Sequence, residues 1–467
     1  MTERAMGSSI EWHELLLPCV PYSSVPSRPA TKQSQPNSNA LLPFRHSAFR
    51  CQDNLKMALF ARRQKLWLTA FALVYAWLFF LCRFHSAQDP TSYFFEPEIG
   101  YRPEYSISRI HESLHFLSRR NYSSVDTVRP STNCTLCVGI VTVKRPLVQN
   151  LNVTVGSLLD GLSQEQRSRV SIHVLFAHTK PSDHPDYGQS WVSRYVDRAL
   201  TYDQLEAPLS KIRRLESERR VSEKSLVDYR LALHSCHKQV DSPWILMLED
   251  DVVAQRRWYE DTLQAIQIVQ QSERRGIVKR WLYLRLFYTE KFLGWNMEEW
   301  PAYLSWSIAV VGMTGVIGMY ARQHARSWQG ILTNSLLTVV CLVCVPLAIL
   351  LYFLAGRMTV QPMKPGVHFM NRHGCCSQAL LFPREQVPLV IDYLDQRQRT
   401  FPQPVDSVIE KLGDEQGMDR LAISPSQMQH VGAASYKENR AVYQWEGMHR
   451  VHGAHGVWSV GFERAFA

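Results

Sequence analysis

The sequence predicts an α/β fold that is interrupted by a membrane hairpin and preceded by a membrane anchor. Three observations lead to this prediction. Apolar runs rich in β-branched residues alternate with charged stretches, three long apolar segments are present, and one apolar run ends in three carboxylates. With 467 residues the chain is long enough for one large or two ordinary domains with a sizeable core.

The N-terminal residues 1–56 predict a disordered cytosolic tail, because Pro, Ser and Asn are frequent there and apolar periodicity is weak. The Met at position 57 is an alternative start, so the presence of this tail in the mature protein is left open. No function is assigned to the tail.

The first apolar segment, residues 66–82, predicts a transmembrane signal anchor. As a helix its length is roughly 25 Å, enough for a thin bilayer. The basic residues that precede it place its amino end in the cytosol: Arg62, Arg63 and Lys65. The alternative is a cleaved signal peptide, but Arg83, Phe84 and His85 follow where small residues would be needed.

The second and third apolar segments form a pair within residues 304–354, at 304–320 and 336–354. A short connection carrying Arg322 and Arg326 joins them, which predicts an antiparallel helical hairpin whose connection faces the cytosol. The alternative is a buried hairpin in a soluble core. Glycines at three-residue spacing permit close helix packing in the second segment: Gly312, Gly315 and Gly318.

The formal net charge of +10 favours a membrane protein over a nucleic-acid-binding protein. No block of five or six consecutive Lys or Arg residues is present, and much of the excess positive charge flanks the apolar segments. We therefore expect a lipid bilayer as a partner and no nucleic acid.

The remaining sequence is assigned to the lumen: a stem at 83–130 and a folded domain in two parts, 131–303 and 357–467. Three glycosylation sequons fall between the first and second apolar segments, on the side that the charge rule makes lumenal. Their acceptor residues are Asn121, Asn133 and Asn152.

Within these parts, four apolar, β-branched runs predict strands: residues 136–143, 170–177, 244–248 and 281–287. The stretch 209–239 is long, charged and free of Gly and Pro, which predicts helix. Alternation of strands and helices predicts a largely parallel sheet.

The run Trp244–Leu248 leads directly into Glu249, Asp250 and Asp251. Ligands of open α/β sheets bind beyond the carboxyl ends of such strands, and clustered carboxylates suit Mg²⁺ or Mn²⁺ bridging a substrate diphosphate. The alternative is that three acids only end a strand at the surface. Dinucleotide-binding, Walker-type and HExxH motifs are absent from the sequence.

Cysteine usage is consistent with an oxidising lumen. Five cysteines are lumenal in this topology, so at least one is left unpaired: Cys134, Cys137, Cys236, Cys375 and Cys376. A local disulfide between Cys134 and Cys137, and a second one from Cys236 to Cys375 or Cys376, are hypotheses.

The order of several motifs resembles the Golgi GPI-anchor N-acetylgalactosaminyltransferases, the family of post-GPI attachment to proteins factor 4. The resemblance covers roughly residues 136–440, including the apolar hairpin inside the domain. Its anchors are Thr142-Val143-Lys144-Arg145, Glu223-Lys224, Asp228-Tyr229, Leu248-Glu249-Asp250-Asp251, Leu282–Leu286, Cys375-Cys376, Leu380–Pro383, Asp406, Pro425 and His430-Val431-Gly432. It implies a GT-A glycosyltransferase domain that is split by a transmembrane hairpin.

The resemblance also implies roles for individual residues in binding a UDP-sugar donor and Mn²⁺ or Mg²⁺. Asp251 corresponds to the direct metal ligand, and Glu249 to the residue that binds the donor ribose or a metal-bound water. Asp250 belongs to the same acidic motif, and Thr142, Val143 and Lys144 lie where the nucleotide is held.

An inverting transfer needs a general base, and the resemblance places Asp406 in that role. The alternative for Asp406 is a helix cap. His430 either completes the donor or metal site or forms hydrogen bonds in the core. Tyr229 either helps to hold the donor or packs as an ordinary helix residue.

The resulting expectation is a multi-pass Golgi enzyme with a cytosolic N-terminus and a lumenal active site. It would transfer N-acetylgalactosamine to a mannose of the GPI-anchor glycan on GPI-anchored proteins, and the choice of this sugar rests on the resemblance. The alternatives are an enzyme like N-acetylglucosaminyltransferase IV, which branches N-glycans, or a catalytically degenerate Golgi protein that only binds.

Overall fold

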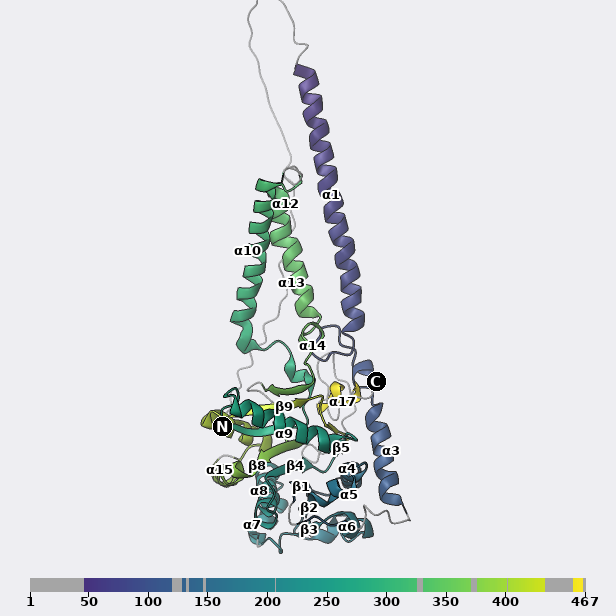
Figure 1. Cartoon of the computed structure of the whole chain (residues 1–467), viewed down its shortest axis with the longest axis vertical. Helices are drawn as coiled ribbons and strands as arrows, with labels where there is room; N and C mark the ends of the chain where they lie inside the picture. The colour runs from purple at the N-terminus through teal and green to yellow at the C-terminus, as the bar shows by residue number, and fades with distance from the viewer. Residues whose placement is uncertain are drawn as a thin grey trace, which may run out of the picture. The chain divides into compact units, whose positions relative to one another are not determined.

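The computed structural model describes residues 46–119, 128–131, 134–145, 148–205, 207–325, 331–370, 376–400, 402–432 and 457–464 (Figure 1). Residues 1–45 of the expected tail lie outside this set, as do Asn121, Asn133 and Cys375. The first helix, α1, runs from His46 to His85 and so includes residues 46–56, which were expected to be disordered. The stretch contains no Gly or Pro, so nothing in it ends the helix before the apolar segment.

The centre of the α/β part is an eight-stranded mixed sheet with the order β3-β2-β1-β4-β8-β6-β9-β7. Its strands are β1 Leu136–Thr142, β2 Val170–Phe176, β3 Arg198–Leu200, β4 Trp244–Glu249, β6 Trp281–Arg285, β7 Gly366–Phe369, β8 Ala379–Pro383 and β9 Asp419–Ser424. The four expected runs are confirmed as β1, β2, β4 and β6. The expectation of a largely parallel sheet was incomplete, because β8 runs antiparallel to β4 and β6, and β7 antiparallel to β9. Both β7 and β8 come later in the chain than the alternation of strands and helices that runs from β1 to β6.

Helices cover both faces of the sheet, which gives three layers. Along β1, Leu136, Val138 and Ile140 join one buried cluster, which α4 (Leu151–Leu159) and α9 (Trp258–Arg274) complete. Cys137 points into the opposite cluster, formed with α7 (Leu209–Ser217), α8 (Val221–Gln239), α15 (Val387–Thr400) and α16 (Val405–Gln416). Because both faces of the sheet are covered, side chains on either side of β1 are buried, which explains why the strand is apolar up to Thr142.

Shorter elements complete the α/β part: α2 Pro97–Gly100, α3 Tyr105–Ser118, α5 Gln164–Ser168, α6 Ser190–Tyr195, α14 Arg357–Val360 and α17 Val460–Arg464. A second, two-stranded sheet pairs β5 (Val252–Ala254) antiparallel with β10 (Met428–His430). The expected helix at 209–239 is divided into α7 and α8, because Arg219 adopts a positive φ of 53° between them.

A disulfide bond joins Cys137 on β1 to Cys236 on α8. The expected bond between Cys134 and Cys137 is therefore wrong, and Cys134 is a buried free thiol. Cys137 faces α8 because it lies on that side of β1, whereas Cys134 precedes the strand. Pairing of Cys236 with Cys375 or Cys376 is also wrong. Cys376 is disulfide-bonded, but its partner is outside the described residues.

The sequon at Asn152 lies on helix α4, which differs from the exposed loop expected of a glycosylated site. Its third residue, Thr154, is fully buried. The Thr154 hydroxyl donates to the Val252 carbonyl at 2.8 Å and accepts from the Val252 amide at 3.2 Å. Thr154 thus packs α4 against β5, and glycosylation of Asn152 stays a prediction.

Between β6 and β7 the chain forms a pair of apolar helices that contact each other (Figure 1). One is α10, Trp300–His324. The other consists of α12 (Asn334–Val339), a π-helical turn (Val340–Cys344) and α13 (Val345–Leu354). Together with the segment Gln64–His85 of α1, these are three helices long and apolar enough to cross a membrane. Both apolar helices interrupt one sheet, because β6 and β7 are strands of it.

Candidate active site

The site lies where β1 and β4 end side by side. Val141 of β1 is paired with Glu249 of β4, so Thr142 and the three acids emerge together at the carboxyl edge of the sheet. On one side of β1 the sheet continues to β2 and β3, and on the other to β4. Ligands of open α/β sheets bind at such a reversal of strand order.

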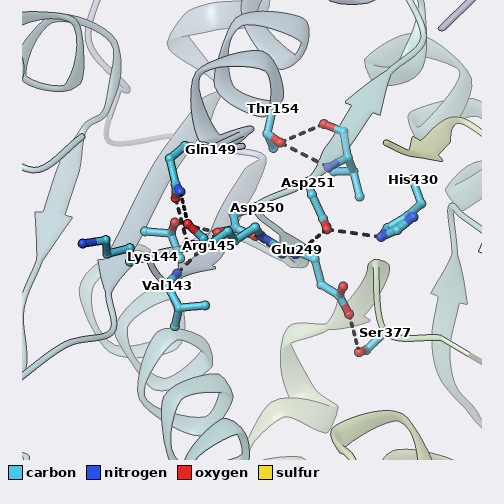
Figure 2. A network of polar contacts seen from close by, with 12 residues as sticks. Val143, Lys144, Arg145, Gln149, Thr154, Glu249, Asp250, Asp251, Ser377 and His430 are labelled. Carbon is cyan, nitrogen blue, oxygen red and sulfur yellow. Dashed lines mark hydrogen bonds and ion pairs between the residues drawn. The ribbon is translucent and has the colours of Figure 1, made fainter. Parts of the chain in front are cut away.

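Asp250 is held by donors from the loop after β1 (Figure 2). Its Oδ2 accepts from the Thr142 hydroxyl at 2.7 Å and from the Val143 amide at 3.4 Å. Its Oδ1 accepts from Arg145, with Nε at 3.1 Å. Both oxygens are therefore engaged, and Asp250 mainly fixes the β1 loop against the end of β4.

Arg145 joins two of the acids. Besides binding Asp250, its Nη1 lies 2.8 Å from Oδ2 of Asp251. The backbone of the same residue exchanges hydrogen bonds with Gln149, from Arg145 N to Oε1 at 3.1 Å and from Gln149 Nε2 to Arg145 O at 2.7 Å. This clamp keeps the guanidinium group over the carboxylates, as Figure 2 shows.

Asp251 is almost fully buried, with a side chain 1% exposed. Its Oδ2 also lies 3.2 Å from Nε2 of His430, whereas its buried Oδ1 has no hydrogen-bond partner among the residues that the structure describes. Burial alone would raise the pKa of Asp251, but the charges of His430 and Arg145 outweigh burial and hold the pKa below its usual range. The ionised carboxylate therefore presents one free oxygen.

His430 reaches Asp251 because β10 pairs with β5, which follows the acids directly. His430 is aligned with Val252, and the Val431 amide donates to the Asp251 carbonyl at 2.9 Å. Burial would lower the pKa of His430, but the carboxylate of Asp251 outweighs it and the pKa is raised. Of the two interpretations offered by the sequence, the structure places His430 beside the acids and not in an apolar core.

Glu249 completes the cluster. Ser377 donates to its Oε1 at 2.9 Å, and one donor atom each of Glu249, Asp251 and His430 lies within 4.8 Å of the other two. Two carboxylates and an imidazole, with an unpaired buried oxygen between them, fit a divalent cation such as Mn²⁺ or Mg²⁺.

Gly432 leaves the space that the cluster needs. A Cβ atom at this position would lie 2.1 Å from Oδ2 of Asp251 and 3.0 Å from Nε2 of His430. Any side chain there would displace one of these two groups. The motif His430-Val431-Gly432 thus combines a ligand with the close backbone approach that only glycine permits.

The loop after β1 also binds two histidines that the sequence analysis did not select. The Lys144 amide donates to Nε2 of His178 at 2.8 Å, and Thr142 Oγ1 lies 2.9 Å from Nε2 of His184. Burial lowers the pKa of His184 to about 4, so this imidazole is neutral. Since the Thr142 hydroxyl donates its hydrogen bond to Asp250, Nε2–H of His184 donates to Thr142. The Nδ1 atom of His184 accepts from the Asp186 amide at 3.2 Å.

The side chain of Lys144 is exposed and points away from the acids in Figure 2. Thr142 is buried and bound to Asp250, and Val143 contributes its backbone amide. Lys144, the third residue expected to hold the nucleotide, therefore contacts the site region through its backbone amide and not through its side chain. The cationic side chain directed at the acids is that of Arg145.

Asp406 lies in the first turn of α16, whose N-cap is Pro404. Its Oδ1 accepts from the Ser407 amide at 2.8 Å and its Oδ2 from the Cys376 amide at 3.2 Å. Cys376 has an unusual φ of +92° and directly precedes Ser377, which binds Glu249. The segment 376–377 thus connects the half-buried carboxylate of Asp406 to the acidic cluster.

Tyr229 lies on α8 within the buried cluster behind the sheet, with 7% of its surface exposed. Burial, with the nearby charge of Glu249, raises the pKa of its hydroxyl well above 10. This hydroxyl is buried and has no hydrogen-bond partner in the described part of the chain. Tyr229 therefore packs as a core residue, near the charge of Glu249.

Sequence reasoning missed Arg145, Ser377, His184 and Gly432 as site residues. Arg145 follows the Thr142–Lys144 motif directly, so its position after β1 was a usable signal. Ser377 and His184 are ordinary residues in irregular segments, and only the folded chain brings them to the acids.

Residues 136–429 of this chain match the family model described as GPI-N-acetylgalactosamine transferase PGAP4. The match covers more than half of the chain. It begins at the first residue of β1, spans both apolar helices between β6 and β7, and ends one residue before His430. Thr142, the three acids and Asp406 all lie within it.

Proposed function

Because the chain belongs to the GPI-N-acetylgalactosamine transferase PGAP4 family of glycosyltransferases, we propose that it transfers N-acetylgalactosamine from UDP-GalNAc to a mannose of the GPI-anchor glycan. We propose further that the transfer depends on a divalent cation and inverts the anomeric centre. The catalytic part is a GT-A-like domain, interrupted between β6 and β7 by a transmembrane hairpin.

The observation that carries this proposal is the buried, unpaired Oδ1 of Asp251 beside Glu249 and His430. A carboxylate with a free oxygen at 1% exposure is costly unless a ligand completes it. Asp251 and Glu249, with His430, would hold Mn²⁺ or Mg²⁺. When bound, the cation would neutralise the diphosphate of the leaving nucleotide.

The residues around this centre bind and orient the donor. Asp250 and Arg145 fix the loop after β1, whose Val143 and Lys144 backbone lines the expected nucleotide position. Glu249 is oriented by Ser377, and its carboxylate would bind the donor ribose or a bound water. The bonded pair of Thr142 and neutral His184 holds this loop without adding charge.

Asp406 is the proposed general base. Inversion requires the acceptor hydroxyl to attack the sugar from the face opposite the leaving diphosphate, and the base takes the proton of this hydroxyl. Two backbone amides, those of Cys376 and Ser407, hold the Asp406 carboxylate in place. Its link to Glu249 through residues 376–377 supports a position at the edge of the donor site.

The three apolar helices are proposed to span the Golgi membrane, with the N-terminus in the cytosol and the α/β part in the lumen. A GPI anchor is embedded in the bilayer by its lipid, so its glycan stays close to the membrane surface. An active site that is attached to three membrane spans is held near the same surface. The enzyme and its acceptor are therefore already close together, which favours their encounter.

The test is release of UDP by the detergent-purified full-length protein with UDP-GalNAc and a GPI acceptor, in Mn²⁺ or EDTA. Wild type should turn over only with the cation, and Asp251→Asn should lose turnover. Asp203→Asn, at an exposed residue far from the acids in sequence, is the matched control and should retain it. Turnover of UDP-GlcNAc in place of UDP-GalNAc would refute the proposed donor. Absence of both turnover and Mn²⁺-dependent UDP binding would refute the enzymatic proposal.

A further inference from the structure

We propose that a cavity between the three apolar helices binds the lipid chains of the GPI acceptor. This inference rests on the proposed function, because it takes the helices as membrane spans and the GPI glycan as acceptor. We call this space the lipid cavity. Its volume is about 1020 Å³, and representative lining residues are Phe71 of α1, Trp306 and Val310 of α10, and Ala348 and Ile349 of α13.

The walls of the lipid cavity are almost entirely apolar over most of its length. Side chains from all three apolar helices contribute, including the aromatic rings of Phe71 and Trp306. Trp306 is 71% exposed and Val310 40% exposed, so the space opens at the surface of the helices. Apolar surface of this kind is unfavourable in water and favourable in contact with hydrocarbon. Hydrocarbon is therefore the occupant that matches this lining at membrane depth.

One end of the lipid cavity is polar, and we call it the rim, formed by Glu299, Tyr303, Tyr352, Arg357 and Gln361. Gln361 Nε2 donates to the Tyr352 hydroxyl at 2.7 Å. The described hydrogen bonds of Arg357 both use Nη1, which lies 3.3 Å from the Gly294 carbonyl and 3.4 Å from Glu299 Oε2. The other donors of the guanidinium fork remain for an oxyanion such as a phosphodiester.

The rim lies at the end of the helices that leads to the α/β part. Trp300 is the first residue of α10 and follows β6 through a short segment, while Leu354 ends α13 before α14 and β7. A lipid with its chains in the cavity and its phosphodiester at the rim would direct its headgroup toward the sheet that carries the active site. A GPI anchor has this chemistry: acyl or alkyl chains, a phosphodiester and then a glycan.

The rim is fixed to the segment after α1 by polar contacts. Asp89 Oδ2 accepts from the Thr359 amide at 2.7 Å and from its hydroxyl at 2.8 Å. The Ser92 hydroxyl donates to the Leu354 carbonyl at 3.0 Å. These contacts join the segment after α1 to α13 and α14, so the cavity has a set shape at the end where the headgroup would lie.

The experiment compares two acceptors with the full-length protein in lipid nanodiscs: a GPI-anchored peptide, and the same peptide after phospholipase C has removed its lipid. Ala348→Trp fills the cavity from α13, and Val310→Trp fills it from α10. Val316→Trp is the matched control, because Val316 is 61% exposed on α10 and does not line the cavity. Native mass spectrometry of each protein, titrated with the lipid-bearing acceptor, measures binding independently of turnover.

We expect both filling variants to lower kcat/KM on the lipid-bearing acceptor about tenfold. Exclusion of two methylene groups of the lipid chain from the cavity is sufficient for a change of that size. Turnover of the lipid-free acceptor and the behaviour of Val316→Trp should not change. Equal losses on both acceptors, or no loss in either filling variant, would overturn the proposal. So would retention of bulk phospholipid that the GPI lipid does not displace.

Failure of wild type on both acceptors would count against the proposed function and not against the cavity. In that case the mass-spectrometric displacement still decides whether the lipid cavity binds the GPI lipid.

Discussion

The Nε2 atom of His430 lies 3.2 Å from Oδ2 of Asp251, so the last strand of the described fold completes a cluster that begins at the end of β4. The pairing of β5 with β10 produces this contact, with His430 opposite Val252. The candidate metal centre therefore cannot form until the C-terminal part of the chain has folded onto the acidic strand.

The first prediction concerns His430. His430→Ala should weaken Mn²⁺ binding by about 10- to 100-fold, since it removes a ligand or the partner that orients Asp251. Titration of Mn²⁺ followed by electron paramagnetic resonance measures this affinity. His115→Ala, at an exposed position of α3, should bind Mn²⁺ like wild type. Unchanged affinity in His430→Ala would exclude His430 from the metal centre.

The second prediction follows from the backbone approach at Gly432. In Gly432→Ala the new Cβ would collide with Asp251 Oδ2, so Mn²⁺-dependent turnover should fall about 100-fold or more. Gly312→Ala is the control, because a Cβ there meets nothing within 4 Å. Steady-state kinetics with UDP-GalNAc would decide. Wild-type kcat/KM in Gly432→Ala would show that the cluster tolerates displacement.

The third prediction concerns the charge balance of the acids. Arg145→Gln leaves Asp250 and Asp251 without their shared cation, and breaking buried ion pairs of this kind costs about 3–5 kcal/mol of unfolding free energy. Arg169→Gln removes a surface pair with Glu165 and should cost about 1 kcal/mol or less. Denaturation in detergent measures both changes. Similar small losses in the two variants would contradict a structural role for the Arg145 clamp.

The fourth prediction tests the proposed base. Asp406→Asn keeps the size of the side chain but cannot accept the acceptor proton, so kcat should fall by about 10²- to 10⁴-fold. Binding of UDP in Mn²⁺ should stay at the wild-type value, which separates this role from donor binding. Asp241→Asn, with a side chain 93% exposed, serves as the control. A loss of UDP binding that matches the loss of turnover would instead assign Asp406 to the donor site.

The fifth prediction concerns the disulfide. Non-reducing peptide mapping should recover Cys137 linked to Cys236 and Cys134 as a free thiol. Replacing both Cys137 and Cys236 by Ser should lower the unfolding free energy by about 2–5 kcal/mol, because the bond closes a long loop. Cys134→Ser leaves that loop closed and should cost less. A linked Cys134–Cys137 peptide would refute the observed pairing.

Local sequence determined the elements whose pattern depends only on neighbours. The runs at 136–143 and 244–248 are largely apolar because both faces of a central strand are covered, and this pattern is visible without the fold. The same holds for the three long apolar helices and for the three acids at the end of β4, since each is a run of neighbouring residues in the sequence. The break at Arg219 was not visible in this way, because no Gly or Pro marks it.

Tertiary structure alone decided which distant groups meet these acids. Arg145, and not Lys144, forms ion pairs with the acids, because the loop after β1 directs the Arg145 guanidinium inward and leaves the Lys144 side chain in solvent. Cys137 pairs with Cys236 because the pleat of β1 points it at α8. His430 and Ser377 reach the cluster through strand pairing and a loop with a positive φ. Such contacts depend on sheet order and register, which arise from packing of the whole chain and leave no periodic trace in a single sequence.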